Sequence, residues 1–176
     1  MKERKYKDDW YNEVSLDDRG REKRTPVYRG SWFRLPAAYP KKALLLRAAL
    51  PWLCFAVLLF LYFRLDFPGT RVLYVFLPAA LALFPGLYWF LGIVSFLRAP
   101  EKMTRLQKET GIGRVLRSAV GCAVFCCAAL VGDLVLLCTG AAGEWPGTLL
   151  ILAAALTALA AALFFRGMNR DLTETK

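Results

Sequence analysis

The sequence predicts an all-α membrane protein, in which four transmembrane helices follow a small cytoplasmic N-terminal tail that can form a β-hairpin. The chain has 176 residues, of which 57% are hydrophobic, yet its charges are strongly segregated. The first 47 residues hold 13 of the 24 Lys and Arg, and the run from Val72 to Leu97 carries no charge. A soluble domain would interrupt its apolar runs with charged residues far more often.

The first element is a polar tail over residues 1–42. Its turn signal, Asp17-Asp18-Arg19-Gly20, lies between two mixed segments, Glu13–Leu16 and Arg21–Val27. This pattern favours a hairpin in which Gly20 supplies a positive φ. An isolated two-stranded hairpin is marginal in water, so we expect the membrane surface or a partner to support it.

The segment after the hairpin interleaves aromatic and basic side chains. Its candidate contacts with the inner membrane surface are Tyr28, Arg29, Trp32, Phe33 and Arg34. Aromatic rings and arginines suit the headgroup layer of a bilayer. The alternative is a disordered basic tail that makes no such contact.

A transmembrane domain is expected over residues 43–165, because a helix of about 20 apolar residues crosses a hydrocarbon core. The four spans are expected at about 43–63, 72–97, 115–137 and 145–165. The second is long, and Pro78 and Pro85 inside it predict a kink.

Two polar segments complete the chain. Between the second and third spans, Glu101–Glu109 suits a short amphipathic helix that Gly111 and Gly113 would end. Residues 166–176 are expected to form a short cytoplasmic C-terminal tail.

The distribution of basic residues predicts the orientation. With four spans, both tails and the loop after Arg98 share one side, which holds 22 Lys and Arg, whereas the other side holds only Arg64 and Arg71. The positive-inside rule therefore places both termini in the cytoplasm of a multi-pass protein in the plasma membrane.

Small residues predict how the spans pack. The fourth span carries Ala154, Ala158 and Ala162 at intervals of four, and the third has its own small face. That face consists of Ser118, Cys122, Cys126 and Ala129. Small residues at helical spacing let helices approach closely in lipid, so we expect a tight antiparallel pair, with more of the lipid-facing surface on spans one and two. The same stripes could instead mediate oligomerisation.

The sequence offers little for catalysis. It has no histidine, and its five cysteines include no Cys-x-x-Cys pair, so neither a metal centre, a redox site nor a cofactor is predicted. The basic charge is accompanied by no nucleic-acid motif, and residues flanking membrane spans account for it. We therefore expect a protein that is not an enzyme and binds no nucleic acid.

Asp133 is the candidate functional residue within the spans. It lies about 10 Å beyond the middle of the third span, towards its outer end. Acids inside spans are costly and often functional. Arg64 and Arg71, the two basic residues on that side, predict a structural ion pair with Asp133. The alternative is an unpaired acid that is hydrated near the outer boundary of the membrane.

Two functions remain open from the sequence. The first is a non-enzymatic accessory protein that acts through lipids of the bilayer, or through a protein partner at the tail or at the small-residue helix faces. The second is a small oligomeric transporter or channel that uses Asp133. Polar residues concentrated outside the spans favour the first, and a hydrated cavity at Asp133 would favour the second.

Overall fold

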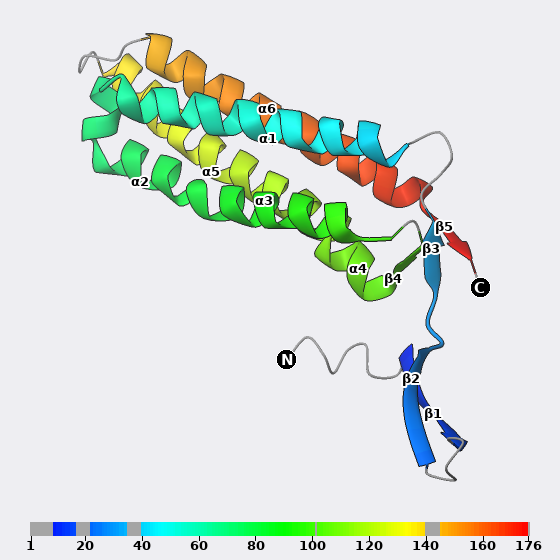
Figure 1. Ribbon diagram of the computed structural model, residues 1–176. Coiled ribbons are helices and arrows are strands. Elements are labelled where there is room, and N and C mark those ends of the chain that lie inside the picture. The colour runs from blue at the N-terminus through cyan, green and yellow to red at the C-terminus, as the bar shows by residue number, and fades with distance from the viewer. Residues whose placement is uncertain (1–8, 17–21, 35–39, 101, 140–144, 176) are drawn as a thin grey trace.

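The computed structural model describes residues 9–16, 22–34, 40–100, 102–139 and 145–175. A bundle of long helices carries two small β-sheets at one end (Figure 1). We call this end the sheet end, and we call the opposite end, where residues 65–72 connect the first two helices, the loop end.

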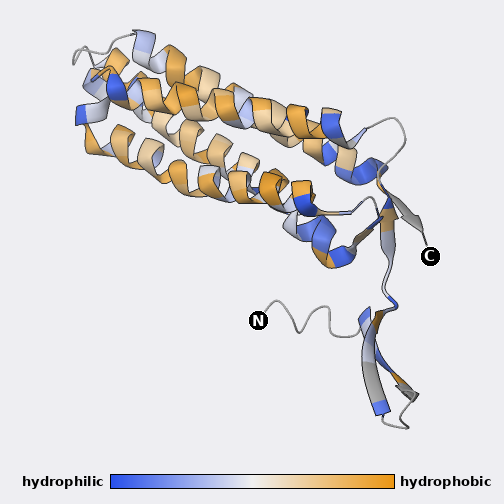
Figure 2. Cartoon of the chain, in the orientation of Figure 1, coloured by the Kyte–Doolittle hydropathy of each residue, from blue (hydrophilic) through white to orange (hydrophobic). Residues whose placement is uncertain are grey.

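Four helical segments are long and apolar enough to cross a membrane, as the sequence predicts. The helices are α1 (Lys41–Arg64), α2 (Leu73–Leu81), α3 (Leu83–Arg98), α4 (Arg105–Thr110), α5 (Ile112–Cys138) and α6 (Trp145–Asp171), with a 3₁₀ helix, η2 (Pro68–Arg71), before α2. Figure 2 shows hydrophobic residues along the long helices and hydrophilic residues gathered at the ends of the bundle.

The second candidate span is interrupted at Ala82, between the two prolines from which the sequence predicts a kink. Helix α2 ends at Leu81 and α3 begins at Leu83. Pro85 has no N–H to donate to the carbonyl of Leu81, four residues earlier, so the helix cannot continue regularly there. The indole N–H of Trp52 in α1 donates to the Gly86 carbonyl at 3.0 Å, which ties the interrupted segment to α1.

The predicted pairing of the last two long helices is confirmed, because α5 and α6 form the most extensive helix–helix contact. Ala154, Ala158 and Ala162 are buried, and so is the small face of α5. Helix α6 also packs on α1, and α5 packs on α2 and α3. In the most apolar 18-residue stretch of each helix, 22% of α1 is buried but 44% of α6, so α1 exposes more of its surface. The segments Leu73–Arg98 and Arg105–Cys138 are equally buried, so the expected contrast does not extend to them.

The N-terminal hairpin is present. Strands β1 (Trp10–Leu16) and β2 (Glu22–Tyr28) pair antiparallel, with Trp10 opposite Tyr28 and Leu16 opposite Glu22. The predicted turn, including Gly20, lies outside the described residues.

A second sheet joins three segments that are far apart in the sequence. Its strand order is β4 (Lys102–Thr104), β3 (Trp32–Arg34) and β5 (Thr173–Thr175), with Phe33 opposite both Met103 and Glu174. The segment after the hairpin, the loop before α5 and the C-terminal segment therefore meet at the sheet end.

Helix boundaries differ from the expected ones before α5 and at the end of α6. The helix expected from Glu101 begins only at Arg105, because Thr104 caps it: its hydroxyl accepts from the Gln107 N–H while the Gln107 side chain accepts from the Thr104 N–H. Gly111 ends this short helix as expected, but Gly113 lies inside α5. Helix α6 continues to Asp171, so it includes the first six residues of the C-terminal tail expected over 166–176.

Candidate functional site

The acid singled out by the sequence is buried where α5 meets α6. Asp133 is 4% exposed, and so is Thr148 in the first turns of α6. The Thr148 hydroxyl donates a hydrogen bond to Asp133 Oδ2 at 2.5 Å. Asp133 therefore receives a partner from the neighbouring helix rather than from a loop.

A second hydroxyl lies close to this pair without a hydrogen bond of its own. Tyr62 in α1 is fully buried, and its hydroxyl has no partner. A methyl group placed on Gly69 would lie 2.6 Å from Asp133 Oδ1 and 2.8 Å from the Tyr62 oxygen, so these two oxygens are at most about 5.4 Å apart. We call the Asp133 carboxylate with the hydroxyls of Thr148 and Tyr62 the oxygen cluster.

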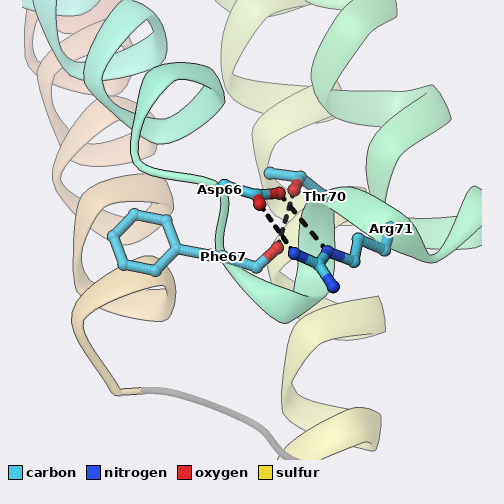
Figure 3. A network of polar contacts seen from close by, with 4 residues as sticks. All are labelled: Asp66, Phe67, Thr70 and Arg71. Carbon is cyan, nitrogen blue, oxygen red and sulfur yellow. Dashed lines mark hydrogen bonds and ion pairs between the residues drawn. The ribbon is translucent and has the colours of Figure 1, made fainter.

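Arg71 does not pair with Asp133, contrary to the expected ion pair. Its guanidinium binds Asp66, with Nη2 2.7 Å from Oδ2, and both side chains are largely exposed (Figure 3). The hydrogen bond from Arg71, followed by its positive charge, lowers the pKa of Asp66. Asp66 is only five residues from Arg71 and stays in solvent, so this pairing requires no desolvation.

Arg64, the other expected partner, is exposed at the end of α1. Within the described part of the chain, no ion pair joins Asp133 to either arginine. The sequence does not predict Thr148 as the partner of Asp133, because a single threonine is common in an apolar helix. Its position near the start of α6 is the feature that could have identified it. Because α6 runs antiparallel to α5, its first turns lie beside the last turns of α5.

The sheet end holds a pocket of about 450 Å³. It is formed by β3, α4 and the ends of α5 and α6, and its lining residues are Ser31, Phe33, Arg105, Lys108, Glu109, Gly113 and Asn169. The Lys108 ammonium lies 4.1 Å from the centre of the Phe33 ring, a cation–π contact. The pocket lining thus combines two basic side chains, one acidic side chain and two small polar side chains with the aromatic ring of Phe33.

Tyr28 connects the hairpin to this end of the bundle. Its ring contacts those of Trp10 and Trp32, with centroids 5.3 and 5.0 Å away. Its hydroxyl accepts a hydrogen bond from the backbone N–H of Arg105 at 3.1 Å and donates one to the backbone carbonyl of Ser31 at 3.0 Å.

The structure thus brings some of the predicted surface residues together. Tyr28 contacts Trp32 and Phe33 lines the pocket, whereas Arg29 lies over the Tyr11 ring at 4.6 Å and Arg34 is exposed. Their contact with a membrane stays a prediction. The sequence does not predict this pocket, because its lining residues come from β3, α4, α5 and α6, which are far apart in the chain and meet only in the folded protein.

Among the described residues, no group of three His, Cys, Asp or Glu side chains could hold a metal ion. Comparison with protein-family models, curated proteins and solved structures gives no match for this chain. The two candidate sites of the described chain are the pocket at the sheet end and the oxygen cluster at the loop end.

Proposed function

We propose that this chain is a non-enzymatic, multi-pass protein of the plasma membrane that binds anionic phospholipid headgroups in the pocket at its sheet end. Both termini and the sheet end then face the cytoplasm. The support for this orientation is the distribution of Lys and Arg, of which 22 lie on the side of the tails and two on the other.

The observation that carries the proposal is the pocket itself. Gly113 is the second residue of α5, and Asn169 is two residues from the end of α6, so the pocket lies where two candidate spans end. In a bilayer this is the level of the headgroups. A volume of about 450 Å³ is typical of pockets for small ligands.

The lining suits a phosphate group beside an apolar surface. Arg105 can offer planar N–H donors and Lys108 a point charge, both of which bind phosphate well. Glu109 in the lining disfavours additional negative charge, so a headgroup with one net negative charge is the better fit. Phosphatidylglycerol has this charge and is the probe we choose.

The test uses the full chain in a mild non-ionic detergent. Added phosphatidylglycerol should raise the unfolding temperature by several degrees more than phosphatidylcholine does, and added salt should reduce the difference. Inorganic phosphate is the third arm: a rise with phosphate alone identifies a soluble phosphate ligand and overturns the lipid assignment.

The variants Arg105→Gln and Lys108→Gln should each reduce the effect of phosphatidylglycerol, and the double variant should abolish it. Arg64→Gln is the matched control, because it removes the same charge from an exposed site at the opposite end. Equal responses to the two lipids, or a full response in the double variant, would refute lipid binding in this pocket.

A second candidate is a small transporter or channel that uses Asp133. The observation that favours it is the unpartnered Tyr62 hydroxyl beside a buried carboxylate. Cation flux into proteoliposomes that is lost in Asp133→Asn would support it. Absence of flux from a folded protein would leave lipid binding as the function.

A further inference from the structure

We propose that the oxygen cluster binds one monovalent cation, for which Na⁺ is the probe. This goes beyond lipid binding at the sheet end and requires no transport. The site consists of the Asp133 carboxylate and the hydroxyls of Thr148 and Tyr62, supplied by α5, α6 and α1.

Charge is the first argument. Asp133 is 4% exposed and lies between helices that we propose to be surrounded by lipid. An ionised carboxylate in such a place needs a positive partner. Among the described residues, no basic side chain forms an ion pair with Asp133. Arg71 binds Asp66 instead. A bound cation would neutralise the carboxylate where it lies.

The Tyr62 hydroxyl is the second and independent argument. A fully buried hydroxyl without a hydrogen bond is costly and uncommon in folded proteins. Its oxygen can act as a neutral ligand of a cation that the carboxylate attracts. The Thr148 hydroxyl, 2.5 Å from Asp133 Oδ2, adds another oxygen beside the same carboxylate.

Gly69 supplies the space. Hard cations of the size of Na⁺ and Ca²⁺ sit roughly 2.3–2.6 Å from their oxygen ligands, so two oxygens on one ion are at most about 5.2 Å apart. The upper limit of about 5.4 Å between Asp133 Oδ1 and the Tyr62 oxygen is compatible with this span. A side chain at position 69 would occupy the space between them, and glycine leaves it open.

The number of carboxylates indicates the charge of the ion. Divalent cations in proteins are held by several acidic or imidazole ligands, but no group of three such side chains exists among the described residues. One carboxylate with two hydroxyls balances a single positive charge. An ion could enter from the loop end, because Gly69 lies in the connection between α1 and α2, and Asp133 lies about 7.5 Å from the end of α5.

The experiment compares unfolding temperatures of the full chain in detergent, in NaCl and in choline chloride, at fixed pH and ionic strength. Sodium should stabilise the wild-type protein by several degrees in a saturable manner, and choline should not. Direct binding of radioactive Na⁺ to the same samples should saturate over the same range of concentrations.

The variants identify the ligands. Asp133→Asn should abolish the sodium effect and should be at least as stable as wild type in choline, because a neutral amide needs no cation. Tyr62→Phe should weaken the apparent affinity for sodium. Asp66→Asn, which removes an exposed carboxylate from the same end, is the control and should keep the full effect.

Three results would overturn the proposal. The first is an equal unfolding temperature in sodium and choline for the wild-type protein, which would assign the space beside Tyr62 to a water molecule. The second is a sodium effect that persists in Asp133→Asn. The third is stabilisation by Ca²⁺ but by no monovalent ion.

Discussion

The hydroxyl of Thr148 donates a hydrogen bond to Asp133 across the α5–α6 interface, with 2.5 Å between Oγ1 and Oδ2. Small side chains such as Ala154 and Ala158 are also buried along α6, which packs on α5 and on α1. Such contacts bring the helices close, but they specify position along the helix axes only weakly. The polar pair adds a directional contact that favours one alignment of the two helices.

Thr148→Val should therefore lower the free energy of unfolding by about 1–2 kcal/mol, because it leaves a buried carboxylate without its donor at nearly constant volume. Unfolding in detergent, followed by circular dichroism, measures the change. Thr157→Val is the matched control: the Thr157 hydroxyl bonds to the Ala153 carbonyl of its own helix, so its removal should change the stability little. Equal losses in the two variants would show that the pair does not stabilise the interface.

Gly69→Ala should destabilise the protein by about 1–3 kcal/mol, because the new methyl group would overpack the oxygen cluster. It would lie within 2.8 Å of both Asp133 Oδ1 and the Tyr62 oxygen, closer than such atoms can approach. The control is Gly167→Ala in α6, where a methyl group meets nothing within 4 Å. That change should stabilise the helix by about 0.5–1 kcal/mol, since alanine favours helix over glycine.

The Gly69 prediction has an internal check. Adding Tyr62→Phe to Gly69→Ala removes one of the two clashing oxygens, so the double variant should lose less stability than the sum of the two single changes. Strict additivity would indicate that the loop moves away from the cluster instead of compressing it.

The pair of Asp66 and Arg71 predicts a pH dependence confined to acidic conditions. The pKa of Asp66 is lowered in the folded protein, first by the hydrogen bond from Arg71 and then by its charge. Its contribution is therefore complete above about pH 3.9, the ordinary pKa of aspartate, and is lost as the pH falls through the lower folded value. The difference in the free energy of unfolding between wild type and Asp66→Asn should be constant near neutral pH and should shrink only below about pH 3.9. A difference that changes between pH 5 and pH 7 would contradict this assignment.

Hydrophobic runs predicted the helices well, because apolar length depends on local sequence alone. The helix interruption before Pro85 and the pairing of α5 with α6 were predictable for the same reason: a missing N–H and a stripe of small residues are local features. The hairpin belongs to this group too, since its turn signal lies between the strands that pair.

The sheet end shows where such reasoning stops. Strand β3 pairs with β4 and β5, which lie about 70 and 140 residues further along the chain. Three strands of three residues carry no periodic signal of their own, and the sequence around Lys102–Thr104 predicts the start of a helix instead of a strand. The partner of Asp133 was missed for a related reason, because it depends on how α5 and α6 are aligned, and Arg71 had a nearer acid in its own loop.

The proposed orientation predicts opposite labelling at the two ends of the bundle. In a variant whose five cysteines are replaced by alanine, Thr139→Cys at the loop end should react with an impermeant maleimide in intact cells. Lys102→Cys at the sheet end should react only after the cells are opened. Both native residues are exposed, so accessibility within the protein does not explain a difference. The reverse pattern would overturn the orientation, and labelling of both in intact cells would contradict an intact membrane barrier between them.

Removal of the C-terminal strand should loosen the N-terminal segment. Strand β5 supplies one of the two partners of β3, so deletion of residues 173–176 leaves β3 paired only with β4. Unpaired backbone is more accessible to proteases, so cleavage by trypsin after Arg34 should become faster. The unfolding temperature of the helices should change little, because α6 ends at Asp171, before the deletion. The control is a chain that keeps residues 173–176 but carries Arg166→Gln, an exposed change on the same helix. Unchanged cleavage in the truncated chain would show that β5 does not hold β3 in place.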